Sequence, residues 1–201
     1  MINFDEKAKE WDKKISNVER AENLRVEIER FLPDTKDMSA VEYGCGTGLL
    51  GFGLLRRFKK MTFSDTSGGM LEVVDKKIAV GKYSNCKTIL LDLDKPVDNS
   101  HRYDCILNSM LLHHIDDTEK AVGSWSERLN KGGYLCIADL MPEDGTFHMM
   151  EFDGHLGFDP ENLRRIMEEN NLVVESITTP HTERRNGKEY PVFLIVAKKG
   201  E

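Results

Sequence analysis

A chain of 201 residues with a formal net charge of −7 is long enough for one domain with a substantial core. Its composition, 39% hydrophobic and 31% charged, argues against disorder. The excess of acidic residues argues against a nucleic-acid or anionic-membrane binder, because phosphates need concentrated Lys and Arg. No stretch approaches the length of a membrane span, and the first residues are too acidic for a signal peptide. The four cysteines form no CxxC pair, so we expect free thiols, a reducing compartment and a cytoplasmic protein.

The N-terminal 37 residues are expected to form a helical cap. Apolar residues recur there at steps of three and four, the spacing of one helical face. They are Phe4, Ala8, Trp11, Ile15 and Val18. We therefore expect one helix over 4–18 and a second over 24–31, which stops before Pro33.

From residue 38 onward, apolar strand-like runs alternate with amphipathic segments. We expect strands over 38–44, 60–65, 86–92, 103–111, 134–140, 172–178 and 190–199, and helices over 48–58, 70–80, 116–133 and 159–171. Strands that alternate with helices predict a doubly wound α/β domain with an open, mostly parallel sheet of seven strands. Asn186-Gly187 is a hairpin signal, so the last strand should be antiparallel. We expect a single domain over 1–201, with 38–201 as its α/β core.

Two helices carry cap signals. Asp116 and Glu119 resemble a capping box for helix 116–133, and Gly132 suits its end. Asp159 is the expected N-cap of helix 159–171, with Pro160 at the first helical position.

The stretch VEYGCGTG, residues 41–48, places three glycines directly after the first strand and before a helix. Glycines there permit a tight turn and let a ligand lie against bare backbone. Asp65 ends the second strand, where a carboxylate can accept both hydroxyls of a ribose, and Asp92 ends the third, placed for an adenine amino group. Glu42, just before the glycines, suits a ligand with positive charge and would repel a pyrophosphate.

GTGLLG, which contains Gly46, Gly48 and Gly51, also satisfies the dinucleotide pattern GxGxxG. Its approach carries Glu42, and no basic residue lies nearby to meet phosphates. S-adenosylmethionine has a sulfonium, an ammonium, a ribose and an adenine but no phosphate, so the three acids match it better. A nicotinamide-dependent oxidoreductase remains the alternative.

The sequence resembles the class I S-adenosylmethionine-dependent methyltransferases over nearly its whole length, and the resemblance implies their Rossmann-like fold. The matching segments are Glu42 to Gly48, FSDTSGGML, LDLD, YDCILNSMLLHHI, LNKGGYLCIADL and GHLGFDPENLRRIMEENNL. The resemblance implies that the glycines pass beside the methionine part, that Asp65 binds the ribose and that Met70, Asp92 and Leu93 border the adenine. Asn108 would lie near the methionine end, and the N-terminal helix would close over the cofactor with Trp11. The implied cofactor-binding set is Trp11, Glu42, Tyr43, Gly44, Cys45, Gly46, Gly48, Asp65, Thr66, Met70, Asp92, Leu93 and Asn108.

Histidines are the candidates for acid–base chemistry. His155, in an H-x-G-F element after the fifth strand, and His113 are the candidate general bases, needed only if the acceptor is protonated and weakly acidic. His155 has the alternative role of tying the loop down, and His114 is expected to be a buried, oriented imidazole. No cluster in the sequence has metal-ligand spacing, so we expect no metal.

The expected activity is methyl transfer to a small organic acceptor by in-line displacement. The chain lacks the N/D-P-P-aromatic motif of class I enzymes that methylate amino groups of nucleobases or glutamine side chains, and has NSML there instead. A binding module without transfer chemistry is the non-enzyme alternative. Arg184, Arg185 and Lys188 beside the hairpin turn are expected to be exposed, with a role against an anionic acceptor as the alternative, and the oligomeric state stays open.

Overall fold

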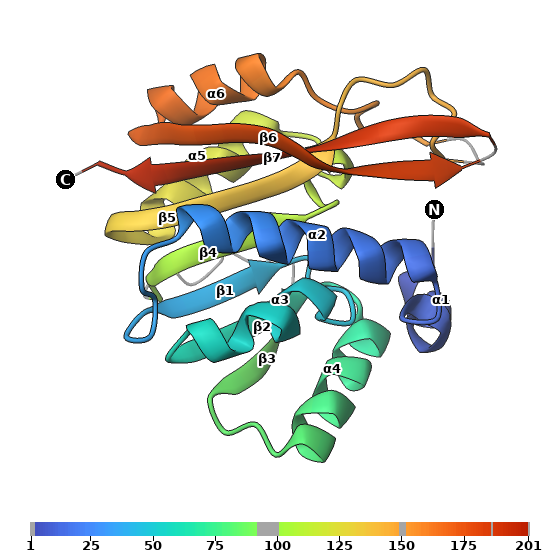
Figure 1. The fold of residues 1–201 in the computed structure, drawn as a ribbon, viewed down its shortest axis with the longest axis vertical. Coiled ribbons are helices and arrows are strands. Elements are labelled where there is room, and N and C mark those ends of the chain that lie inside the picture. The colour runs from blue at the N-terminus through green and yellow to red at the C-terminus, as the bar shows by residue number, and fades with distance from the viewer. Residues whose placement is uncertain (1–2, 92–100, 149–151, 186, 201) are drawn as a thin grey trace.

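The computed structural model describes residues 3–91, 101–148, 152–185 and 187–200, and Figure 1 shows the arrangement of their helices and strands. The helices are α1 (Phe4–Trp11), α2 (Ile15–Phe31), α3 (Leu49–Leu54), α4 (Gly68–Gly81), α5 (Thr118–Arg128) and α6 (Pro160–Glu169), with short 3₁₀ turns at Leu55–Arg57 and Leu112–His114. The strands are β1 (Ser39–Tyr43), β2 (Lys60–Asp65), β3 (Cys86–Leu90), β4 (Tyr103–Ser109), β5 (Leu129–Leu140), β6 (Leu172–Arg185) and β7 (Lys188–Lys199).

All seven strands belong to one sheet in the order β3-β2-β1-β4-β5-β7-β6. Strands β1 to β5 pair in parallel, and β7 lies antiparallel between β5 and β6. The predicted seven-stranded, mostly parallel architecture is therefore confirmed. The chain passes from β1 outward to β3 and then returns to β4, so the sheet has its topological switch point between β1 and β4, where such sheets bind ligands.

Two apolar clusters pack on the two faces of the sheet. Helices α2, α3 and α4 contribute to one cluster, together with the buried Phe63 of β2. Helices α5 and α6 contribute to the other, with Trp125 and Met167 among its members. The sheet is thus covered by helices on both sides (Figure 1).

The boundary between the first two helices differs from the prediction. The chain leaves α1 after Trp11, and α2 begins at Ile15, so 4–18 is not one helix. Ile15 and Val18 are 72% and 42% exposed, and therefore do not continue the apolar face of α1. Lys14 is extended, and Asp12 at the break is engaged by Thr47 and Lys77. A tertiary contact thus takes precedence over the periodicity.

Helix α5 is shorter than predicted at both ends. Asp117, not Asp116, caps it by accepting the backbone N–H of Lys120. The helix ends at Arg128, and the LNKGG segment belongs to β5 instead. The N-cap of α6 is confirmed: the Asp159 side chain accepts the N–H of Glu161, and Pro160 is the first helical residue.

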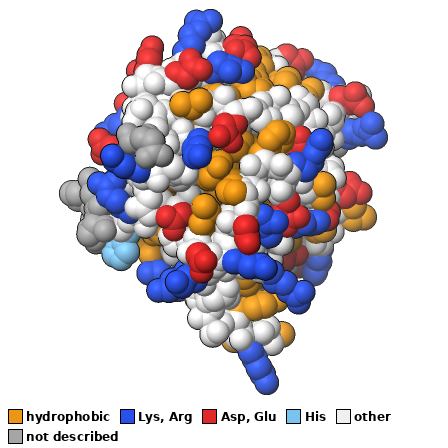
Figure 2. Space-filling view, turned by 60° about the vertical axis from the view of Figure 1, so that its left-hand side comes forward, with side chains coloured by type: hydrophobic (Ala, Val, Ile, Leu, Met, Phe, Trp, Pro, Cys, Tyr) orange, Lys and Arg blue, Asp and Glu red, His pale blue; other side chains and the backbone are white. Residues whose placement is uncertain are grey.

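Charged side chains of both signs are interspersed on the face that Figure 2 shows, around a band of apolar side chains. Over its described part, this face carries no continuous basic surface of the kind that follows a nucleic-acid backbone. None of the described helices combines the length and the apolar character that crossing a membrane requires.

Candidate functional site

A cleft of about 1140 Å³ opens where the parallel strands end. The predicted site residues that line it are Trp11, Glu42, Tyr43, Gly44, Cys45, Gly46, Asp65, Thr66, Met70 and His113. Among the described residues, Gly48, Asn108 and His155 lie outside this lining. Asp92 and Leu93 fall outside the described residues, and their predicted place at the adenine edge stays a prediction.

The glycine turn after β1 has the left-handed backbone that its sequence predicts. Gly44, Gly46 and Gly48 have φ values of +63°, +52° and +77°. Only Gly46 faces open space, because a Cβ built on it would meet nothing nearer than the Trp11 Nε1, at 3.8 Å. A Cβ on Gly48 would press on the rings of Phe52 and Phe63. Gly48 therefore shapes the turn as the N-cap of α3, and Gly46 leaves room for a ligand.

Asp65, at the end of β2, holds the glycine turn in place. One carboxylate oxygen accepts the N–H of Gly46 at 2.7 Å, and the other accepts the N–H of Ser67 at 2.9 Å. Burial raises the pKa of this carboxyl group, and the backbone N–H donors of Ser67, Gly46 and Thr66 oppose that shift. A carboxylate has about four lone-pair sites, so Asp65 keeps acceptor capacity toward the cleft.

Glu42 lies beneath the same turn, 3% exposed, where it accepts the N–H of Gly51 at 3.1 Å. Burial raises its pKa to about 8, and the N–H of Gly51 only partly opposes the shift. In the ligand-free protein Glu42 is thus mostly protonated at neutral pH. The sequence predicted an ionised acid ready for a cation; the structure instead gives an acid that ionises when a positive charge arrives or the pH rises.

We expect Glu42→Gln to remove a pH dependence of stability. The pKa of Glu42 is about 8 in the folded protein and about 4.5 in the unfolded chain, so folding favours the protonated form. The protonated side chain therefore contributes its full stability below about pH 4.5, and this contribution is lost as the pH rises to about 8. The loss should be a few kcal/mol, at about 1.4 kcal/mol per pKa unit. Glutamine keeps the acceptor for Gly51 without the charge. Urea unfolding of both proteins from about pH 5 to about pH 9 measures this; parallel pH curves would contradict it.

Helix α1 is fastened over the cleft by acids at both of its ends. Asp5 accepts the Ser67 hydroxyl at 2.5 Å and the N–H of Gly69 at 2.8 Å, at the start of α4. Asp12 forms an ion pair with Lys77 at 2.6 Å. These contacts place Trp11, the last residue of α1, opposite Gly46.

The predictions for Met70 and Asn108 have different outcomes. Met70 lies on α4, 1% exposed, in the wall of the cleft as expected. Asn108 is 1% exposed, and both polar atoms of its side chain lack a hydrogen-bond partner among the described residues. Asn108 is the second-to-last residue of β4, next to Ser109 in the cleft wall, so its expected place near the methionine end stays a prediction.

His113 forms a buried pair with Asp139. The imidazole Nδ1 lies 2.6 Å from one oxygen of Asp139, and the backbone N–H of His113 donates to the other oxygen at 3.2 Å. Asp139 is fully buried at the end of β5, and His113 follows β4, its parallel neighbour in the sheet. A carboxylate on Nδ1 fixes the neutral ring in the tautomer that leaves Nε2 as an acceptor.

Three imidazoles meet at this end of the cleft. One ring nitrogen from each of His113, His114 and His148 lies within 4.8 Å of the others, a spacing that could hold a metal ion. The sequence showed no such spacing because His148 joins the pair from a separate segment. His114 is exposed rather than buried, with its ring edge-on to Phe4. Burial, followed by the nearby charges of His113 and Arg185, lowers the pKa of His148 to about 4, so His148 is neutral at pH 7.

His155 does not have the predicted role as a base. Its Nε2 lies 3.0 Å from the backbone oxygen of Ile115 and 3.2 Å from that of Asp116. Its backbone N–H donates to the oxygen of His113 at 2.9 Å. These three contacts tie the loop after β5 to the turn that carries His113, so the alternative expectation for His155, an anchor for the loop, is the one that fits.

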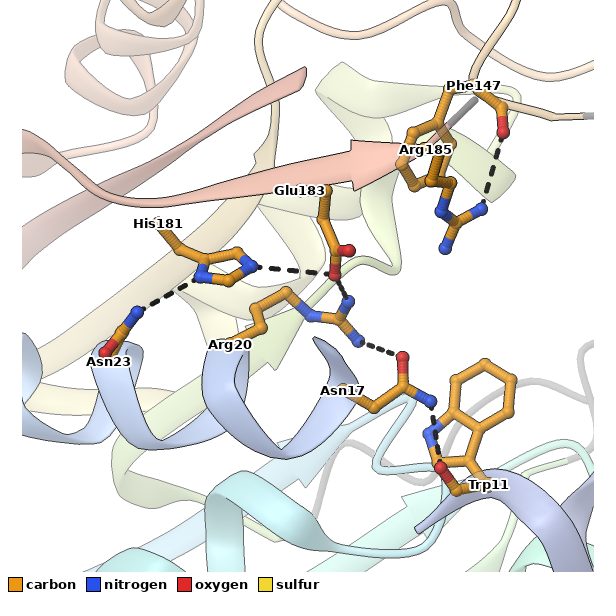
Figure 3. Close-up of polar contacts among 8 residues, drawn as sticks. All are labelled: Trp11, Asn17, Arg20, Asn23, Phe147, His181, Glu183 and Arg185. Carbon is orange, nitrogen blue, oxygen red and sulfur yellow. Dashed lines mark hydrogen bonds and ion pairs between the residues drawn. The ribbon is translucent and has the colours of Figure 1, made fainter. Parts of the chain in front are cut away.

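Sequence reasoning missed two groups at the acceptor end. Arg185, expected to be exposed, is half-buried and lines the cleft beside Phe147 (Figure 3). Asp139 was not singled out, although an acid at the end of a parallel strand is a signal that could have found it. For Arg185 the sequence offered a role against an anionic acceptor only as an alternative, because its place depends on how far β6 extends toward the hairpin.

The comparisons agree with this geometry. Residues 17–177 match the methyltransferase domain family. An uncharacterised methyltransferase of Schizosaccharomyces pombe is 29% identical over 151 residues, which cover 67% of this chain and 53% of that protein. This chain therefore spans about half of that relative's length.

Solved structures show the same fold at low sequence identity. The methyltransferase in a complex with the Trm112 activator of Haloferax volcanii has a TM-score of 0.79 at 14% identity, and the N-methyltransferase NodS of Bradyrhizobium japonicum, solved with S-adenosylhomocysteine, has 0.73 at 17%. Each alignment covers 100% of both chains. The antiparallel β7 also departs from the dinucleotide-binding strand order, which counts against the oxidoreductase alternative. The chain belongs to the methyltransferase domain family, as a class I domain whose cofactor is S-adenosylmethionine.

Proposed function

We propose that this chain methylates a small organic acceptor by in-line displacement, with cofactor and acceptor side by side in the one cleft. The observation that carries the proposal is the open space over Gly46, bounded by Trp11 and continuous with the His113 end of the cleft. A volume of about 1140 Å³ exceeds what a single drug-sized ligand fills, so it has room for both.

The glycine end of the cleft fits the cofactor. Gly44 and Gly46 would give its methionine part a bare backbone, Asp65 would accept from the ribose hydroxyls, and Met70 would pack against the adenine. Glu42 would become ionised beside the cofactor's positive charge. When bound, the cofactor supplies an electrophilic methyl group on a sulfonium, and the residues of this chain orient the two reactants and exclude water.

The histidine end of the cleft suits an acceptor that must lose a proton. His113 is the candidate base there, because Asp139 occupies its Nδ1 and leaves Nε2 toward the cleft. Asp139 would also stabilise the imidazolium that forms when the ring takes the proton. Phe4, Phe147 and His148 give this end an aromatic wall, which suits an organic acceptor.

Calorimetry and turnover together test the proposal. We expect S-adenosylhomocysteine to bind and to raise the melting temperature, and NAD to do neither. In a panel of small acids, phenols, thiols and amines, at least one compound should be methylated, with conversion of S-adenosylmethionine to S-adenosylhomocysteine. Stabilisation by NAD alone would overturn the cofactor half. Tight binding with no turnover across the panel would support the non-catalytic module instead.

A further inference from the structure

Arg185 presents a positive charge to the acceptor end of the cleft. It is the last residue of β6, and its guanidinium carbon lies 3.9 Å from the centroid of the Phe147 ring. Its Nη1 donates a long hydrogen bond of 3.4 Å to the backbone oxygen of Phe147. Figure 3 shows the guanidinium turned away from the strand, toward the side on which Trp11 lies. The guanidinium packs on the face of the Phe147 ring, and most of its N–H groups remain available to donate hydrogen bonds to a ligand.

The charges around Arg185 do not neutralise it. Glu183, two residues earlier on β6, forms a buried ion pair with Arg20 of α2. Asp139 is taken by His113. Among the residues that the structure describes, no carboxylate oxygen lies within 4.0 Å of a guanidinium nitrogen of Arg185. His148, which also lines the cleft, adds no negative charge, because an imidazole is neutral or positive.

Glu183 forms its ion pair with Arg20 and not with Arg185. Asn17 of α2 accepts from Arg20 at 3.4 Å, and His181 lies 3.7 Å from the same oxygen of Glu183 that Arg20 contacts (Figure 3). The charges of Arg20 and Glu183 therefore cancel inside the protein, and the charge of Arg185 remains on the wall of the cleft. A half-buried charge without an ion-pair partner costs stability unless a ligand supplies the opposite charge.

We propose that Arg185 binds a carboxylate of the methyl acceptor, so that the substrates of this domain are small organic acids with an apolar or aromatic body. The guanidinium fork matches the two oxygens of a planar carboxylate. The inference rests on the proposed function in one respect: it takes the carboxylate ligand of Arg185 to be the methyl acceptor.

The position of the subsite also limits the size of the acceptor. The Phe147 ring under Arg185 stands edge-on to His113, with ring centroids 6.5 Å apart. The carboxylate subsite and the candidate base thus border the same phenyl ring, so a small acceptor can contact both. A long or uncharged acceptor fits this arrangement poorly.

Arg185→Gln and Arg184→Gln form a matched pair for the test. Arg184 is the neighbouring residue, but its side chain is 79% exposed and pairs with Glu189 at 3.1 Å. Hexanoate and benzoate, with their amides as uncharged controls, are titrated into each protein by calorimetry, with and without S-adenosylhomocysteine. We expect both acids to bind the wild type and Arg184→Gln alike, to bind Arg185→Gln at least about tenfold more weakly, and to bind better than their amides.

Every outcome of these titrations either supports or overturns the proposal. Equal binding of the acids to Arg185→Gln, no binding to the wild type, or equal binding of acids and amides would overturn the carboxylate site, and displacement by sulfate at equal concentration would overturn the carboxylate class. Arg185→Lys keeps the charge and should bind the acids with intermediate strength, which covers a failure of Arg185→Gln to fold. If S-adenosylhomocysteine fails to bind while the acids still need Arg185, the proposed function falls and this site stands.

Discussion

His113→Ala is expected to lower turnover by about 10²–10⁴-fold and to leave the affinity for S-adenosylhomocysteine nearly unchanged, if the ring acts as the general base. The imidazole is 2% exposed, lines the acceptor end and is held by Asp139 at 2.6 Å. A base acts on the acceptor in the transition state and not on the bound nucleoside, so the loss should appear in the chemical step. Single-turnover rates and calorimetry with the same protein separate the two.

Two companion variants sharpen this test. Asp139→Asn keeps the shape but can present an N–H to Nδ1, which favours the wrong tautomer, so it should lose much of the same rate. His155→Ala should cost stability, because its Nε2 lies on the oxygens of Ile115 and Asp116, while the rate per folded molecule stays near wild type.

Other results would assign the histidines differently. If dialysis against a chelator abolished turnover and Zn²⁺ restored it, His113, His114 and His148 would be metal ligands, and Asp139 would orient His113 as a ligand. If His113→Ala turned over like the wild type, the acceptor would need no base, as for a carboxylate that is already ionised.

The parts of the site that the sequence predicted are those that a short stretch of chain encodes. Three glycines after a strand require a left-handed turn, and all three have positive φ. Asp65 ends a strand that pairs with β1, so its place beside the turn follows from the parallel sheet. The N-cap of α6 is equally local.

The predictions that were missed or wrong concern residues whose neighbours come from separate segments of the chain. Asp139 and His113 are 26 residues apart and come together only because β4 and β5 pair in parallel. His155 lies in the predicted loop, but a motif gives its position along the chain and not the direction of its ring. Arg185 was misplaced for a similar reason: β6 extends to the hairpin, and alternation along the strand turns Arg184 to solvent and Arg185 to the cleft.

Gly46→Val should abolish cofactor binding, by about 100-fold or more, while the fold remains. The site has φ of +52°, and a side chain there would project into the space that separates it from Trp11. It would also meet any ligand that lies against the N–H of Gly46, which Asp65 holds in position. The left-handed backbone adds a strain of about 1–2 kcal/mol for a residue with a Cβ.

Gly187→Val is the matched control, because it separates strain from obstruction. Gly187 has φ of +75°, and a Cβ on it would meet no described atom within 4 Å. Both variants should lose about 1–2 kcal/mol in urea unfolding, but only Gly46→Val should lose S-adenosylhomocysteine binding by calorimetry. If both kept wild-type affinity, the glycines would serve only the turn. If both lost it, the effect would come from a destabilised fold, and the space between Gly46 and Trp11 would not be where the cofactor lies.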